Sequence, residues 1–266
     1  MKLNIKLKFI LIFKLIFVTL ISAAQTKLQD SNSKIIIHQV TLGIGLTYFY
    51  YNQSQSSISP LNFKSFRGPS TFLEYKYKWN SDFFLLFNFK QAPGYINSGE
   101  TLKVKNHNFN WKTYSLDFKS KLSSNNKVFL GRKIEYGIAS GFLYHQAPIL
   151  SLTEMNTAEI EYTNISVLNL GGFLDYQLNN KINTEVFFRY GHVFATRNIT
   201  LTQPLLFDGS LGLQYHFNSN LAYGWYWYGQ YQTYKYSHND SNSNTKNIGK
   251  QTLLYSNMDL RLILKF

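Results

Sequence analysis

Charged side chains recur at alternate positions within apolar segments of this sequence. Between Leu73 and Trp79, for example, Glu74, Lys76 and Lys78 alternate with apolar or aromatic residues. Because successive side chains of a β-strand point to opposite faces, this spacing gathers charge on one face. The charges predicted to share that face are Glu74, Lys76, Lys78, Lys90, Asp117, Lys119, Lys133, Glu135, Asp175, Glu185, Arg189, Asp208, Asp259 and Arg261. Both signs occur, so these groups are suited to ion pairing or to lining a path for ions.

The other residue types that could do chemistry form no catalytic or metal-binding pattern. The histidines are His38, His107, His145, His192, His216 and His238, and no H-E-x-x-H or other close metal spacing occurs. Without cysteine, disulfides, thiol catalysis and thiolate metal sites are excluded. Gly171-Gly172 and Gly43-x-Gly45 lack the strand-to-helix context of a phosphate loop. The sequence therefore predicts no catalytic, cofactor-binding or metal-binding residue.

Residues 1–24 predict a secretory signal peptide. Three lysines precede the almost wholly apolar run Phe9–Leu20, and small residues follow as far as Ala24. We expect cleavage before Gln25, with an uncleaved membrane anchor as the alternative. Residues 25–37 are then a periplasmic N-terminal lead-in, and residues 38–266 are the folded domain. No later stretch reaches the roughly 18 apolar residues of a spanning helix, so a membrane location requires a closed barrel.

Ten segments alternate apolar and polar residues as half-buried strands do. They are predicted at 38–50, 70–79, 83–90, 111–119, 128–144, 164–178, 182–194, 205–217, 221–236 and 255–266. Long polar loops are expected at Asn52–Gly68, Ala92–Asn110, Gln146–Glu161, Ala195–Pro204 and Ser237–Lys250, and the other connections are short turns. Short periplasmic turns alternating with long extracellular loops are typical of outer-membrane barrels. We therefore expect an all-β, transmembrane, antiparallel up-and-down β-barrel of about ten strands, with eight or twelve as alternatives.

The last strand has one fully apolar face. Met258, Leu260, Leu262, Leu264 and Phe266 lie at alternate positions and end the chain in an aromatic residue. This ending resembles the last strand of bacterial outer-membrane β-barrel proteins. The resemblance implies that the barrel-assembly machinery reads this strand, with Phe266 as an assembly signal.

The composition agrees with a membrane barrel. Aromatic residues make up 17% of the chain and charged residues only 15%, and tyrosine and tryptophan gather near the predicted strand ends, as they do at membrane interfaces. The net charge of +13 falls to +9 without the leader, because four lysines lie there (13 − 4 = 9). The basic residues are scattered along the chain and form no stripe, so we interpret the positive charge as compositional bias. We expect outer-membrane lipid, but no nucleic acid, as a partner.

The predicted interior charges allow two interpretations. Side chains nearly fill the interior of a small barrel, and buried charges must be paired. A salt-bridged plug that fixes strand register is therefore expected, and a narrow water-filled pore lined by the same groups is the alternative.

A third hypothesis places an enzyme at the extracellular rim. His145 and His192 lie near predicted extracellular strand ends, and Asp208 lies near the start of the strand after His192. The strand count resembles that of the omptin proteases, which use Asp and His at the rim. The sequence contains no matching paired-Asp or Asp-His motif, so no omptin residue is assigned here.

These observations favour a non-enzymatic outer-membrane protein that is structural or forms a narrow passive channel and needs no cofactor. Adhesion or recognition through the long loops is the alternative, and a rim-sited enzyme is the third reading. The expected location is the bacterial outer membrane, and the sequence defines neither a ligand nor an oligomeric state.

Overall fold

The structure is a computed structural model in which residues 37–55, 58–96, 103–105, 108–122, 128–129, 131–154, 157–197, 199–239 and 246–266 are described. The predicted signal peptide and nearly all of the predicted lead-in lie outside these residues. The strands are β1 (Ile37–Gln55), β2 (Ile58–Lys78), β3 (Phe83–Tyr95), β4 (Lys103–Lys105), β5 (Asn108–Lys121), β6 (Val128–Phe129), β7 (Arg132–Glu154), β8 (Thr157–Gln177), β9 (Ile182–Thr196), β10 (Thr200–His216), β11 (Leu221–Asn239) and β12 (Lys246–Lys265). Among the described residues, no helix is long and apolar enough to cross a membrane.

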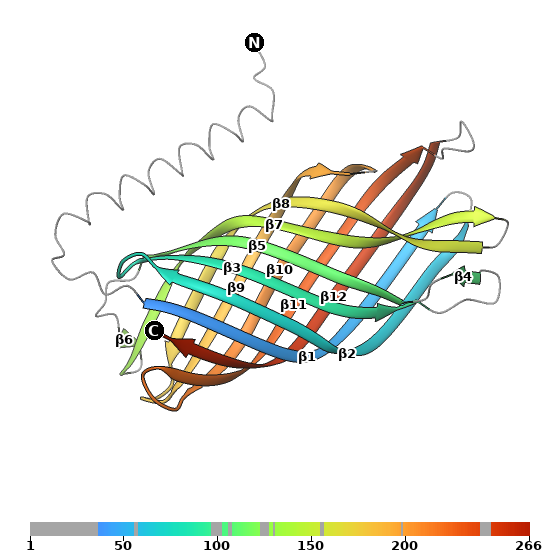
Figure 1. Ribbon diagram of the computed structural model, residues 1–266. Helices are drawn as coiled ribbons and strands as arrows, with labels where there is room; N and C mark the ends of the chain where they lie inside the picture. Colours follow the sequence, from blue (N-terminus) through green and yellow to red (C-terminus); the bar gives the residue numbers. More distant parts are fainter. Residues whose placement is uncertain are drawn as a thin grey trace, which may run out of the picture.

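Ten long strands of the described chain close into a barrel (Figure 1). Each pairs antiparallel with its neighbours in the chain, and β1 pairs with β12 to complete the ring. At this seam His38 and Phe266 exchange backbone hydrogen bonds of 3.1 and 2.8 Å. The two short strands lie outside the ring, where β4 pairs with β8 and β6 pairs with β7. The predicted up-and-down barrel of about ten strands is confirmed.

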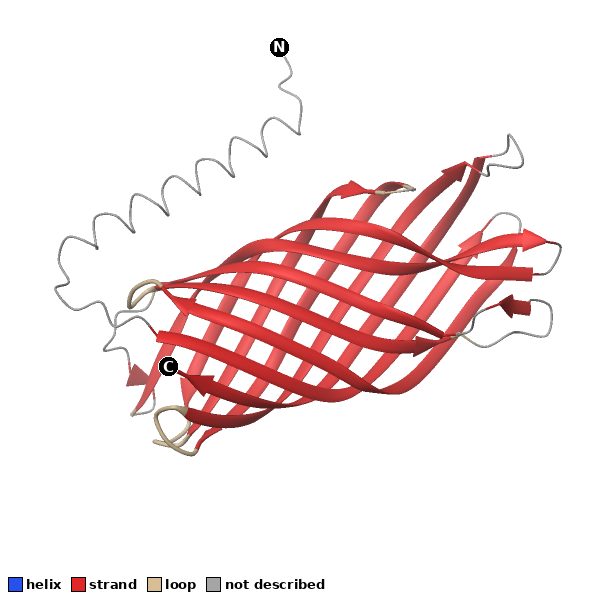
Figure 2. Cartoon of the chain, viewed as in Figure 1, coloured by secondary structure: helices blue, strands red, loops and turns tan. Residues whose placement is uncertain are grey.

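One end of the barrel is formed by tight turns, and Figure 2 shows that the chain also ends there. Asn80, Asn179 and Asn218 begin three of these turns, and each side-chain oxygen accepts backbone N–H bonds of 2.8–2.9 Å from the residues two and three positions later. This geometry explains why asparagine marks these turns. The predicted turn at 123–126 lies outside the described residues. We call this the turn end and the opposite end the outer end.

The predicted long loops are the main error of the sequence analysis. The segments Asn52–Gly68, Gln146–Glu161, Ala195–Pro204 and Ser237–Lys250 are largely paired strand, and the segment Ala92–Asn110 begins and ends as strand and contains β4. In the first segment Asn52 pairs with Asn62, and Gln53 and Phe63 are buried. Amide and hydroxyl side chains therefore continue the alternation of inward and outward residues beyond the apolar region. The prediction of a loop from the polarity of these segments is wrong.

The outward side chains of the barrel form an apolar belt. Leu42, Ile44 and Leu46 on β1 are 48–57% exposed, and their register neighbours Leu262 and Leu260 on β12 are 43% and 66% exposed. A continuous apolar band around a closed barrel is the lipid-facing surface of transmembrane β-barrels. The predicted apolar faces of these strands therefore point outward, and the charged faces point inward.

Gly45 lies where β1 must approach β12 closely, beside a register irregularity with β2. A Cβ atom there would collide with the carbonyl oxygen of Met258 and the carboxylate of Asp259. Gly45→Ala is therefore expected to lower the free energy of unfolding by about 1–3 kcal/mol through overpacking. Denaturant unfolding of refolded protein measures this loss. Gly172→Ala is the matched control, because a Cβ there meets only a carbonyl oxygen at 3.4 Å, and an equal loss in both variants would contradict the prediction.

Candidate functional site: the charged interior of the barrel

Arg189 on β9 connects two carboxylates across the barrel interior. Its side chain is almost fully buried, and its Nε and Nη2 atoms donate to both oxygens of Asp208 on the neighbouring strand β10, at 3.0 and 2.5 Å. Its Nη1 atom donates to Asp117 on β5, which is three strands away around the ring. A bidentate fork is the strongest geometry for an arginine–carboxylate pair. Arg189 therefore fixes β9 and β10 to β5 through the lumen.

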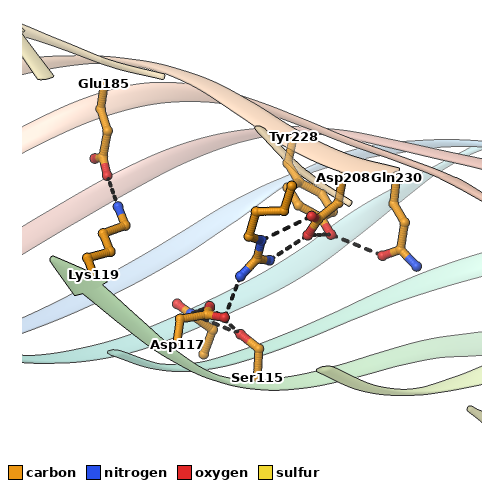
Figure 3. A network of polar contacts seen from close by, with 9 residues as sticks. Ser115, Asp117, Lys119, Glu185, Asp208, Tyr228 and Gln230 are labelled. Atoms are coloured by element: carbon orange, nitrogen blue, oxygen red, sulfur yellow. Dashed lines mark hydrogen bonds and ion pairs between the residues drawn. The ribbon is translucent and has the colours of Figure 1, made fainter. Parts of the chain in front are cut away.

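Neutral side chains donate further hydrogen bonds to these two carboxylates. Ser115 Oγ and Asn88 Nδ2 donate to Asp117 at 2.9 and 3.1 Å, and Tyr228 Oη donates to Asp208 at 3.1 Å. Figure 3 shows Ser115 and Asp117 facing Asp208 and Tyr228 across the network. Buried charges are tolerated when their remaining lone pairs are satisfied in this way.

A second cross-barrel ion pair lies nearer the turn end. Lys119 Nζ on β5 is 2.7 Å from Glu185 Oε1 on β9, and Gln214 donates to the other oxygen of Glu185 at 3.1 Å. The Arg189–Asp117 and Lys119–Glu185 ion pairs therefore both join β5 to β9 across the lumen. The space left among these groups is a cavity of only about 50 Å³, which suffices for a few water molecules.

Arg261 and Asp259 form a third pair within β12. Arg261 Nη2 donates to Asp259 at 3.1 Å, and the guanidinium lies 3.7 Å from the ring centre of Phe72 and 4.0 Å from that of Tyr226. Lys90 is held differently, with its ammonium 3.1 Å from the ring centre of Tyr228. These cation–π contacts replace hydration for buried cations.

Aromatic side chains close the interior on the outer side of the charges. We call Phe49, Tyr51, Phe109, Trp111, Tyr228 and Tyr255 the aromatic seal; all are at most 3% exposed. The Trp111 ring stacks on Tyr255 at 5.7 Å and on His145 at 5.2 Å between ring centres. The ion pairs and these rings thus occupy successive parts of the interior.

The structure brings the predicted interior charges together in two groups. Asp117, Lys119, Glu185, Arg189, Asp208, Asp259 and Arg261 form the contacts described above, and Glu74 and Lys90 line the same small cavity. Lys76, Lys78, Lys133, Glu135 and Asp175 line a larger cavity at the turn end. Lys121, which pairs with Glu135, was missed because the predicted strand ended two residues earlier. Continuing the alternation from Lys119 would have found it.

The histidines do not form a rim site. His145 was expected near the extracellular strand end, but its side chain is fully buried in the interior, with Nε2 2.9 Å from Gln232 Oε1. Asp208 is not at the rim either, because it is bound by Arg189. His192 is partly exposed on β9. No group of three or more His, Cys, Asp or Glu residues in the described part of the chain could hold a metal ion.

Comparisons with known proteins identify a fold and no family. No family model matches the sequence, and no curated protein matches it. Among solved structures, the outer membrane protease OmpT from Escherichia coli superposes with a TM-score of 0.59 and 10% identity, covering 89% of this chain and 99% of that chain. Neisserial surface protein A gives 0.36 and 9%, covering 87% and 97%, and the Pseudomonas putida toluene transporter TodX gives 0.32 and 10%, covering 86% and 90%.

The likeness to OmpT and the apolar belt define the class of this protein. It has the fold of the bacterial outer-membrane β-barrels, as the sequence analysis predicted. This fold supports the predicted location in the bacterial outer membrane. At 10% identity the likeness extends to the fold alone and not to protease chemistry.

Proposed function

We propose that the protein is a non-enzymatic structural barrel of the outer membrane with a closed interior. The observation that carries this proposal is that the ion pairs of the Arg189 network and the rings of the aromatic seal both occupy the lumen. A channel needs a continuous polar path, whereas here the central cavity is about 50 Å³ and is bordered by ion pairs. The alternative of a narrow passive channel is therefore less well supported than a plug.

The described residues retain fewer of the features that suggested the two remaining hypotheses. Adhesion through long loops relied on segments such as Asn52–Gly68, which are largely paired strand. A rim enzyme relied on His145, His192 and Asp208. His145 and Asp208 are buried in the interior, and His192 is partly exposed on β9. A non-enzymatic role thus remains the proposal that fits the described side chains best.

We also propose that Phe266 acts as an assembly signal for the barrel-assembly machinery. Its side chain is 69% exposed, and its backbone closes the seam with β1. An exposed ring beside the β1–β12 seam is accessible to an assembly factor.

Purified protein inserted in a planar lipid bilayer is expected to give no stepwise ion conductance, because the lumen is closed. An open porin in the same bilayer shows that insertion and recording work. The double variant Lys76→Ala with Lys78→Ala should be equally silent, since these lysines lie on the turn-end side of the closure. If the wild type gave steady conductance steps and their size changed in this variant, the proposal of a closed lumen would be wrong. The protein would then be a channel lined by these lysines.

A further inference from the structure

A cavity of about 370 Å³ lies inside the turn end of the barrel. We call it the vestibule. Its charged lining consists of Lys76, Lys78, Lys121, Lys133, Lys265, Glu135, Asp175 and Glu185. The charge network of the central interior lies between the vestibule and the aromatic seal.

Two of the three vestibule carboxylates are already neutralised. Lys121 Nζ and Lys133 Nζ both contact Glu135, at 2.5 and 2.8 Å. Glu185 is bound from the inner side by Lys119 at 2.7 Å. Neither carboxylate therefore needs a further cation from the vestibule wall.

The remaining charges leave the vestibule positive. Lys76, Lys78 and Lys265 form no ion pair among the described residues. Of the lining carboxylates only Asp175 is left to balance these three ammonium groups, and it forms no ion pair within the described chain. A partly enclosed wall with this excess of positive charge concentrates anions.

The three lysines lie on the strands that flank β1. Gln39 on β1 is in register with Lys265 on β12 and with Lys76 on β2, so the three residues form one row across the sheet. Two strand spacings, about 10 Å, separate the backbones of the two lysines. Gln39 Nε2 uses one hydrogen on Thr41 Oγ1 at 3.3 Å and has another to donate. Two long ammonium side chains on either side of an amide donor can converge on one group between them.

We propose that the vestibule binds a phosphate-bearing anion between Lys76 and Lys265, with Gln39 donating to it and Lys78 adding positive charge. Phosphate carries up to two negative charges and several acceptor oxygens, which suit ammonium groups that bind as point charges. Because outer-membrane barrels place their short turns in the periplasm, the vestibule takes its ligand from that side. Free phosphate and a phosphate monoester offer the same chemistry to this wall.

Isothermal titration calorimetry on the full chain, refolded into non-ionic detergent at low salt, tests the proposal with inorganic phosphate and with glycerol 3-phosphate. Binding of inorganic phosphate supports a free oxyanion as the ligand, and binding of glycerol 3-phosphate alone supports a monoester. In the Lys76→Gln/Lys265→Gln double variant the affinity is expected to fall about tenfold or more, since a hydrogen bond to a charged group is lost at each position.

Lys235→Gln is the matched control, because this exposed lysine lies on β11 near the outer end, and it should bind like the wild type. An unchanged shift between boiled and unboiled gel bands shows that each variant is folded. Absence of heat with both anions overturns the proposal, and so does equal binding by the folded double variant and the wild type.

Discussion

Arg189→Met is expected to destabilise the barrel by about 3–5 kcal/mol, the cost of removing one partner from a buried ion network. The substitution keeps most of the side-chain volume but leaves Asp117 and Asp208 facing each other without a cation. Both carboxylates are at most 5% exposed, so solvent cannot replace the guanidinium. Denaturant unfolding in detergent micelles, followed by tryptophan fluorescence and by the gel shift between folded and unfolded bands, measures the loss.

Lys133→Met provides the comparison for this prediction. The Lys133 side chain is 50% exposed, and Glu135 keeps Lys121 as a partner, so the expected loss is about 0–1 kcal/mol. Combining Arg189→Met with Asp117→Asn and Asp208→Asn should recover much of the lost stability, because no charge then remains buried without a partner. Equal losses for Arg189→Met and Lys133→Met would show that the cross-barrel network contributes no more than a surface pair.

Alternation along the strands was sufficient to predict the fold and to choose the inward face. Glu74, Lys76 and Lys78 line interior cavities, because one residue in two must point inward wherever the opposite face is apolar. The same rule failed in Asn52–Gly68, where most side chains on both faces are polar. Composition there is that of a loop, and only the register between β1 and β2, such as the pairing of Asn52 with Asn62, identifies the strands.

The partners within the interior could not be predicted from the sequence. Arg189 and Asp117 are 72 residues apart, and their contact depends on the curvature of the closed barrel and the register of the strands between them. His145 illustrates the same limit, because its distance along the chain from Gln232 gives no sign of their contact. Alternation assigns a side chain to the lumen but not to a neighbour across it.

Leu260→Arg is expected to cost about 2–4 kcal/mol in a lipid bilayer, the penalty for arginine on the lipid face near the midplane of a membrane barrel. Leu260 points outward and is 66% exposed, with Ile44 and Trp225 beside it on the neighbouring strands. In the bilayer this surface contacts acyl chains, which cannot solvate a guanidinium. Guanidinium-induced unfolding of protein reconstituted in phospholipid vesicles gives the difference in free energy.

Thr252→Arg tests whether position in the belt, and not arginine itself, causes the loss. Thr252 lies on the same strand and pairs with Thr233 and Asn52 beyond the apolar residues, so its substitution should cost about 0–1 kcal/mol, as near a membrane interface. In a lipid-facing barrel the penalty must fall along β12 from Leu260 toward the outer end. If both variants were equally stable, the apolar belt would not contact lipid, and its side chains would have to be covered by another protein surface.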